Sequence, residues 1–452
     1  MIKDDTPLNT KMLQGVLVAL LLFVCASLQA QSPEAILAKA KDHAKTLAGP
    51  DMKGRGYQEE GHFLAARYIA DRYSEYGLEP IKGVGSSDYP YFQPFSFSTN
   101  IIKSLSLNLD KVPLKEGAQF IAASYTGRGE VDMDKVRYIK YGLPEDYKKS
   151  VKGKVVVFKS GLPDKITEDP ALKKKYNDLA RDQAKIQLAH RAGAKGVVVI
   201  KKKLTAGLNP MPVDFPVLEV LESELPKRKV KKAELAVDAG LKRVNTQNVI
   251  GMIRGSEQPD SAIILCGHYD HLGTQGEAIF YGGNDNASGT ALLLSLAEHY
   301  GKPENKPKYT MVFIAFGGEE AGLHGSRHYV QKKPSFPLAQ TSFVMNMDLM
   351  ANGDEGVTLV AGANFPAHRD LFRKVNDANK AVPKVNSQSN RPNSDHYYFT
   401  EAGVPALFIF TLGGPPHYHD INDNFENMRF SRFLEIRSLL IDYFAVLQDP
   451  NR

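Results

Sequence analysis

The sequence has few of the residues that hold small secreted proteins together. It contains two cysteines among 452 residues, Cys25 and Cys266, and no tryptophan. Cys25 lies in an apolar N-terminal run, which leaves Cys266 as a single thiol that cannot form an intramolecular disulfide. Because Cys266 ends a strand-like apolar stretch, we interpret it as a packing residue rather than a nucleophile. The fold is therefore expected to depend on its apolar core.

The sequence also lacks internal repeats and a strong charge of one sign. The net charge of +6 comes from 57 basic and 51 acidic residues that are intermixed, and the lysine clusters near 172–175, 201–203 and 227–232 are short. This pattern is typical of a solvated surface and does not indicate nucleic-acid binding. The chain is ordinary for a globular protein, with 42% hydrophobic and 24% charged residues. Its length predicts two or three structural units.

Residues 1–30 have the pattern of a secretory signal peptide. Lys11 precedes an apolar run from Val16 to Val24, and small and polar residues follow through Ala30. The run is shorter than the roughly 20 residues needed to span a bilayer, so no permanent membrane anchor is expected. We therefore predict cleavage after Ala30 and a secreted or periplasmic protein.

Helical periodicity dominates the sequence that follows. Apolar residues recur every three or four positions on both sides of the turn at Asp51–Arg55, and Gly77 and Pro80 end the second helical pattern. Strand-like alternation follows at 91–97 and 104–109. Residues 31–112 are therefore expected to form the N-terminal part of the main domain.

Residues 113–240 have a different character. Strand patterns at 155–158 and 196–200 flank an amphipathic stretch at 185–192, and a proline-rich return follows at 215–217. Histidine and acidic residues are not clustered in this region. It is expected to be a small α/β insert with a packing, lid or interaction role.

Strands and helices alternate regularly in residues 241–452. Strand patterns lie at 263–266, 310–316, 343–347, 357–361 and 405–410, and helical patterns at 287–299, 324–331, 367–379 and 432–447. This alternation predicts a largely parallel sheet covered by helices in a three-layer α/β/α fold.

Six polar side chains in this last region follow strands or lie beside glycines: His268, Asp285, Glu319, Glu320, Asp348 and His419. In α/β sheets, reacting groups collect beyond the carboxyl ends of the strands, so these side chains are expected to meet. Adjacent carboxylates after a buried strand are costly to bury unless a cation neutralises them. Imidazole and carboxylate ligands without thiolate favour zinc in a hydrolytic site.

Two zinc ions fit the charges better than one. Two dications would balance the carboxylates of Asp285, Glu320 and Asp348 together with a bridging hydroxide. The other glutamate of the Glu319–Glu320 pair is then free to act as a general base toward the metal-bound water. The residue pattern by itself does not decide which glutamate is the ligand.

The motifs resemble those of the co-catalytic di-zinc aminopeptidases, metallopeptidase family twenty-eight, whose relatives include glutamate carboxypeptidase and the inactive transferrin receptor. The similar stretches occur in the family's order: Asp51–Gly56, His268–Gly273, Gly283–Gly289, Gly318–Gly322, Asn346–Asp348, Tyr418–His419, and the acidic residues Asp423 and Glu426. The insert resembles a protease-associated domain, at Gly153–Val157 and Ala192–Gly196. The resemblance covers nearly the whole chain after residue 30.

Roles for individual residues are implied by this resemblance. Asp285 would bridge two Zn²⁺ ions, with His268 and Asp348 completing one site and Glu320 and His419 the other. Glu319 would be the general base. Tyr418 would donate to the oxyanion, and Asp270 would orient the His268 imidazole. His396, in Ser394–His396, resembles a substrate-side residue, and His271 has no assigned role.

The resemblance implies a phosphorylase/hydrolase-like zinc exopeptidase, most simply an aminopeptidase acting on peptides or oligopeptides. Its parts would be a peptidase domain from 31–112 and 241–452, and the insert at 113–240. A carboxypeptidase or dipeptidase on the same two-metal centre is the alternative, because the sequence does not show the specificity pocket. A non-catalytic receptor on the same scaffold is a more distant alternative, since all five ligands and the base are present. The oligomeric state is left open.

Overall fold

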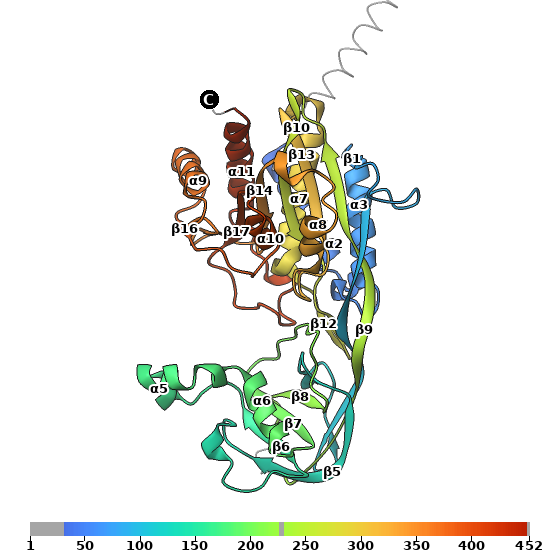
Figure 1. The fold of residues 1–452 in the computed structure, drawn as a ribbon, viewed down its shortest axis with the longest axis vertical. Coiled ribbons are helices and arrows are strands. Elements are labelled where there is room, and N and C mark those ends of the chain that lie inside the picture. Colours follow the sequence, from blue (N-terminus) through green and yellow to red (C-terminus); the bar gives the residue numbers. More distant parts are fainter. Residues whose placement is uncertain (1–30, 226–229, 450–452) are drawn as a thin grey trace, which may run out of the picture.

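The computed structural model describes residues 31–225 and 230–449, so the predicted signal peptide lies outside the described residues. The chain forms a main lobe and a small lobe, which lie at opposite ends of the view in Figure 1. We call the β4–β8 region, residues 120–221, the small lobe. No helix within the two described ranges is long and apolar enough to span a bilayer.

Two long strands, β2 (Phe92–Leu109) and β9 (Lys232–Ile253), run along both lobes. They pair antiparallel from Phe92 opposite Val249 to Leu109 opposite Ala233. The sequence predicted two separate strands where β2 is continuous, because the polar residues near Ser104 mark a register irregularity rather than a turn. It did not predict β9, whose middle is polar and partly exposed.

The main-lobe sheet has the order β16-β15-β17-β14-β10-β13-β9. Its strands besides β9 are β10 (Gln258–His268), β13 (Tyr309–Phe316), β14 (Thr341–Met347), β15 (Val357–Val360), β16 (Val385–Ser387) and β17 (Ala406–Thr411). The central strands β13, β10, β14 and β17 are parallel, whereas β9 runs antiparallel to β13, and β15 runs antiparallel to β17 and parallel to β16. The predicted α/β fold with a largely parallel sheet is confirmed.

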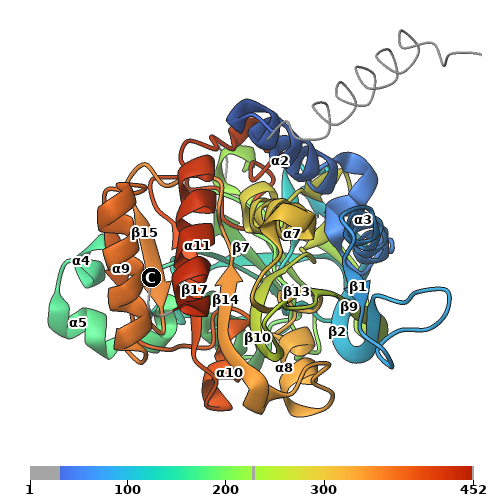
Figure 2. The ribbon, with the colours of Figure 1, turned by 90° about the horizontal axis from the view of Figure 1, so that it is seen from above.

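Helices cover both faces of this sheet (Figure 2). The helices of the main lobe are α2 (Pro33–Leu47), α3 (Gly61–Glu75), α7 (Gly289–Gly301), α8 (His324–Gln331), α9 (Pro366–Asn379), α10 (His396–Glu401) and α11 (Phe433–Gln448). Side chains alternate along each strand, so Leu265 of β10 packs in the core with α7 and α11, while its neighbour Cys266 packs on the other face with Tyr329 and Phe399. Cys266 is free and fully buried, in agreement with the packing role.

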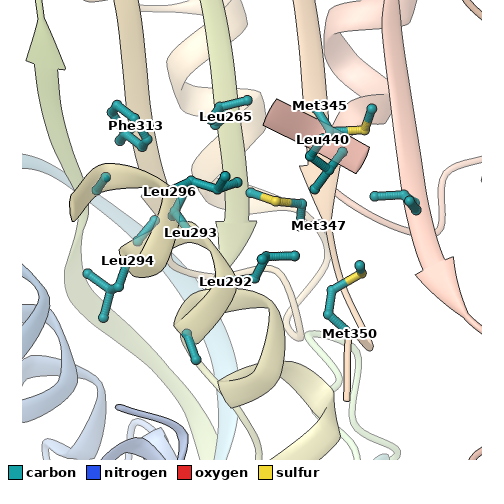
Figure 3. Packing of buried hydrophobic residues seen from close by; sticks show 14 of the residues in the cluster. Leu265, Leu292, Leu293, Leu294, Leu296, Phe313, Met345, Met347, Met350 and Leu440 are labelled. Carbon is teal, nitrogen blue, oxygen red and sulfur yellow. The ribbon is translucent and has the colours of Figure 1, made fainter. Parts of the chain in front are cut away.

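The larger core lies between the sheet and α7. Leu265, Phe313 and Met345 come from three adjacent strands and lie near the leucines of α7 (Figure 3). Burying each such side chain contributes about 1.5–3 kcal/mol. This packing holds α7 against the strands, and with it the loop before α7, which carries Asp285.

The small lobe has a sheet of its own. Strands β5 (Gly129–Tyr138), β6 (Val155–Lys159), β7 (Gly196–Lys201) and β8 (Val217–Leu221) are parallel, and β4 (Phe120–Ala122) pairs antiparallel with β8. Its helices are α4 (Asp164–Thr167), α5 (Pro170–Lys175) and α6 (Asp182–Arg191). Two apolar clusters, one on each side of this sheet, give the lobe its own core.

The remaining elements are short. They are the strands β1 (Glu79–Pro80), β3 (Val112–Pro113), β11 (Gly273–Gln275) and β12 (Ala278–Phe280), and the segments η1 (Pro50–Arg55), η2 (Pro144–Asp146), η3 (Asn177–Ala180), η4 (Glu222–Glu224), η5 (Gly283–Ser288), η6 (Pro303–Asn305), η7 (Leu338–Gln340) and η8 (Phe425–Asn427). The hairpin β11–β12 follows β10 and lies beside the small lobe (Figure 1).

Candidate metal centre

The carboxyl ends of three neighbouring parallel strands bring the candidate ligands together. His268 ends β10, Glu319 and Glu320 follow β13, and Asp348 follows β14. Because these strands are adjacent in the sheet, their ends open at the same edge. Asp285 joins them from η5, just before α7.

His268, Asp285 and Asp348 form the first group. Nε2 of His268 lies 3.2 Å from Oδ1 of Asp285 and 3.4 Å from Oδ2 of Asp348. All three side chains are buried, and one ligand atom from each lies within 4.8 Å of the others. This arrangement is suited to a single cation.

A second group forms on the other oxygen of Asp285. Nε2 of His419 lies 3.1 Å from Oδ2 of Asp285 and 3.2 Å from Oε2 of Glu320. His271, Asp285 and Glu320 also offer ligand atoms within 4.8 Å of one another. Asp285 therefore directs its two oxygens at two separate groups, which is the geometry of a bridging carboxylate.

The donor set fits zinc. Oδ1 of Asp348 and Nε2 of His271 are buried and make no hydrogen bond with any described residue. Buried polar atoms without partners are costly, and metal coordination removes that cost. The ligands are nitrogen and carboxylate oxygen without thiolate, as in hydrolytic zinc sites.

Glu319 differs from Glu320 in its surroundings. Both oxygens of Glu320 face imidazoles, from His271 at 2.6 Å and from His419 at 3.2 Å. Glu319 lines the cavity, and burial together with the neighbouring Glu320 charge raises the pKa of its carboxyl well above the usual value. A carboxyl with a raised pKa that faces a cavity is suited to accept and return a proton.

Asp270 holds the site through contacts that the sequence did not specify. Nδ1 of His268 lies 3.1 Å from the carbonyl oxygen of Asp270 and 3.8 Å from its carboxylate, so the hydrogen bond uses the backbone. The carboxylate instead accepts from the backbone N–H of Glu319 at 3.2 Å and from the hydroxyl of Tyr57 at 2.9 Å. Burial raises the pKa of Asp270 to about 6. Asp270 thus fixes both His268 and the backbone of Glu319.

Arg55 holds the backbone around His268 and Asp285, and the sequence did not predict this role. Its side chain is fully buried, and its guanidinium donates to the carbonyl oxygens of Leu47, Tyr269, Tyr281, Gly282 and, at 3.4 Å, Asp285. Gly282 has a φ of 58°, and a Cβ there would lie 2.2 Å from the Asp285 carbonyl oxygen and 2.6 Å from the Arg55 guanidinium. Only glycine fits at this close approach.

Asp423 is a second support. Its carboxylate accepts from the backbone N–H groups of Asn284 at 2.8 Å and Asp285 at 2.9 Å. These bonds join the loop that carries His419 to the loop that carries Asp285. The resemblance of Asp423 to a family motif was the available signal, but its backbone partners could not be read from the sequence.

A cavity of about 220 Å³ opens beside the ligands. It is lined by His268, Asp285, Glu319, Asp348, Leu349, Asn393, Phe408, Phe410 and Tyr418. Tyr418 is 59% exposed, and its ring stacks on His419 with 3.8 Å between the ring centroids. The cavity therefore combines an apolar wall with the polar groups of the centre.

His396 lies away from the cavity wall. Its ring is fully buried 5.5 Å from the ring of Phe408, and burial lowers the pKa of His396 to about 3. From the same motif, the Ser394 hydroxyl donates to Oδ2 of Asp348 at 3.0 Å and accepts from Asn346 at 2.7 Å. The motif thus reaches the centre through Ser394, whereas His396 packs behind Phe408.

Residues 248–444 match the family model described as Peptidase family M28. The chain is 27% identical over 322 residues to Aminopeptidase YwaD of Bacillus subtilis, a match that covers 66% of this chain and 63% of the relative. It is 31% identical over 208 residues to Glutamate carboxypeptidase 2 homolog of Caenorhabditis elegans, covering 42% and 24%. These matches span less than two thirds of each relative's length.

The fold is similar to that of a solved structure. The zinc aminopeptidase BSAP from Bacillus subtilis superposes with a TM-score of 0.68 at 20% sequence identity, covering 92% of this chain and 96% of that one. The likeness therefore extends over both lobes.

Proposed function

We propose, from the premise that residues 248–444 belong to peptidase family M28, that this chain is a zinc-dependent aminopeptidase. One observation carries the proposal: Asp285 directs Oδ1 at the His268–Asp348 group and Oδ2 at the His419–Glu320 group. A carboxylate shared between two such groups is suited to a pair of zinc ions and not to a structural site. The names of YwaD and BSAP support the same activity.

Two zinc ions would be held by these residues. His268 and Asp348 would complete one site and Glu320 and His419 the other, with Asp285 shared. When bound, zinc supplies Lewis acidity toward a carbonyl oxygen and lowers the pKa of a coordinated water to about 7.

The protein's own groups would then move the protons. Glu319 would take a proton from the attacking water and deliver it to the amine that leaves as the peptide bond breaks. Its backbone N–H, held by Asp270 at 3.2 Å, keeps the carboxyl at the cavity. The hydroxyl of Tyr418, a residue that lines the cavity, would donate to the developing oxyanion.

Aminopeptidase activity can be tested with one peptide in three forms: free, acetylated at the amino end, and amidated at the carboxyl end. Only the acetylated form should resist cleavage. Removal of metal with a chelator should abolish turnover, and zinc should restore it, with full activity at two equivalents per chain. Cleavage of an aminoacyl anilide offers a direct rate. No turnover with any metal would contradict the proposal.

A carboxypeptidase is the second candidate, because a relative with 31% identity carries that name. The same peptide set separates the two: a carboxypeptidase would cleave the acetylated form and spare the amidated form. The metal ligands and Glu319 would keep their roles in either case.

We also propose export through residues 1–30, and a protease-associated insert at 113–240 within a peptidase domain formed by 31–112 and 241–452. The separate apolar clusters of the small lobe support the insert. Sequencing the amino end of the protein recovered from its native host tests export, and a mature chain that begins near Gln31 is the expected result.

A further inference from the structure

The loop that carries His419 has little structure of its own. Between β17 and η8 the chain runs from Leu412 to Asn424 without a helix or strand. His419 has a φ of 59°, in the left-handed region that a non-glycine residue rarely adopts. Backbone held in such a conformation requires contacts from its surroundings.

The small lobe supplies those contacts. Nζ of Lys203 donates to Oδ2 of Asp420 at 2.7 Å and to the carbonyl oxygen of Pro416 at 2.8 Å. It also lies 3.4 Å from the carbonyl oxygen of Tyr418. Three residues on, the backbone N–H of Ala206 donates to the carbonyl oxygen of His419 at 3.1 Å. The small lobe thus contacts the backbone on both sides of the His419 side chain.

Asp420 depends on this contact. Its carboxylate is only 4% exposed, and Lys203 is the amine that faces it. The other groups near it are the backbone N–H of Asn422 at 2.6 Å and the ring of His417 at 3.7 Å. A buried carboxylate that loses its cationic partner is costly, so the loop would rearrange to expose it.

The segment that bears Lys203 is itself fixed to the main lobe. Leu204 and Ala206 are buried in one apolar cluster with Leu272, just before β11, and Phe280, the last residue of β12. Lys203 is therefore anchored on the same side of the main lobe that carries His268 and Asp270.

We infer that Lys203 of the small lobe is a positioning residue for the loop that carries Tyr418 and His419, so that the small lobe helps to build the metal centre. This inference rests on the proposed function. The zinc ion held through His419 should depend on Lys203, whereas the ion held by His268 and Asp348 should not.

The test compares Lys203→Met with Lys203→Arg and with Lys202→Met. Lys202 is the adjacent exposed lysine and serves as the matched control. Each metal-free protein is first checked for folding by circular dichroism, and then titrated with zinc against a competing chelator to obtain both the stoichiometry and the two affinities. kcat and KM are measured at saturating zinc.

Lys203→Met should lower the affinity for the zinc ion held through Glu320 and His419 by about tenfold or more, the usual effect of losing a group that orients a ligand. The affinity for the ion held by His268 and Asp348 should not change. kcat should fall more than KM rises. Lys203→Arg should restore the affinity to within a few fold, and Lys202→Met should match the wild type. If Lys203→Met does not fold, Asp420→Asn takes its place with the same expected loss.

Wild-type protein that binds two ions, together with a folded Lys203→Met variant whose two affinities and kcat are unchanged, would overturn the inference alone. Wild-type protein that binds no zinc would overturn the proposed function and the inference with it. An equal loss of affinity for both zinc ions would also overturn the inference, because a general loss of packing acts on both groups of ligands.

Discussion

Nδ1 of His271 lies 2.6 Å from Oε1 of Glu320, while Oε2 of the same carboxylate faces His419. His271 had no role in the sequence interpretation, although it follows His268 by three residues. As an N–H donor it holds the carboxylate so that Oε2 is directed at the group shared with Asp285. We predict that His271→Ala weakens zinc binding by about 10- to 100-fold, measured by chelator competition.

The stoichiometry of the same variant distinguishes two roles for His271. A positioning role leaves two ions per chain at high zinc concentration, whereas a ligand role leaves one. His328→Ala is a suitable control, because His328 lies on α8 and stacks on Phe95. Unchanged affinity in His271→Ala would mean that the Glu320 carboxylate is held well enough by its other contacts.

Glu319→Gln should separate metal binding from turnover. Glutamine fills the same space but cannot carry the proton from water to the leaving amine, so kcat should fall at least about a hundredfold while both zinc ions are retained. Metal content by atomic absorption and the anilide rate check the two parts. The exposed Glu304 provides the matched control, Glu304→Gln. Near-normal turnover in Glu319→Gln would remove this residue as the base.

Arg55→Lys should destabilise the protein. The guanidinium reaches carbonyl oxygens in three separate segments, and an ammonium cannot reproduce that planar fork. Burial lowers the pKa of Arg55 to about 10, so the group remains charged at neutral pH. Carbonyls left without a donor in a buried site cost about 1–3 kcal/mol each.

We therefore expect Arg55→Lys to lower the free energy of unfolding of the metal-free protein by about 3 kcal/mol or more. Urea unfolding measures it, and Arg67→Lys on the exposed side of α3 is the control. A loss no larger than that of the control would show that water or rearranged backbone satisfies the carbonyls.

Much of the fold could be predicted because the apolar periodicity of its strands and helices is local. The pattern at 324–331 matches α8 in full, and the strand pattern at 263–266 lies within β10, which ends at His268. Strand β9 was missed because pairing with β2 and β13, rather than its own apolar content, makes it a strand.

The supports of the site could not be predicted in the same way. Arg55, Asp423 and Lys203 act mainly on backbone groups, which carry no residue identity in the sequence. Their partners lie far away along the chain and are brought close only by the packed lobes. His419 was a candidate from the residue pattern, but its place beside Asp285 and Glu320 could not be predicted, because it lies on an irregular loop rather than directly at a strand end.

The stability of the N-terminal helices should depend on pH through His43. Nδ1 of His43 is hydrogen-bonded to the hydroxyl of Tyr68 at 2.6 Å, and Nε2 to the hydroxyl of Tyr76 at 2.9 Å. Burial lowers the pKa of His43 from 6.5 to about 4. Between pH 6.5 and about 4 the unfolded chain therefore binds a proton that the folded protein does not. The contribution of the neutral His43 ring to the free energy of unfolding is fully present above pH 6.5. It falls as the pH is lowered toward 4, and at pH 5 the loss is about 2 kcal/mol.

His43→Gln keeps a polar group between the two tyrosines but cannot titrate. The free energy of unfolding of the metal-free wild type should therefore fall more steeply than that of His43→Gln when the pH is lowered from 7.5 to 5, even if the variant is less stable at pH 7.5. Because both proteins lack metal and retain the same other groups, the difference in slope belongs to His43. Parallel pH profiles for wild type and His43→Gln would show that the folded protein binds the proton at His43 as readily as the unfolded chain does.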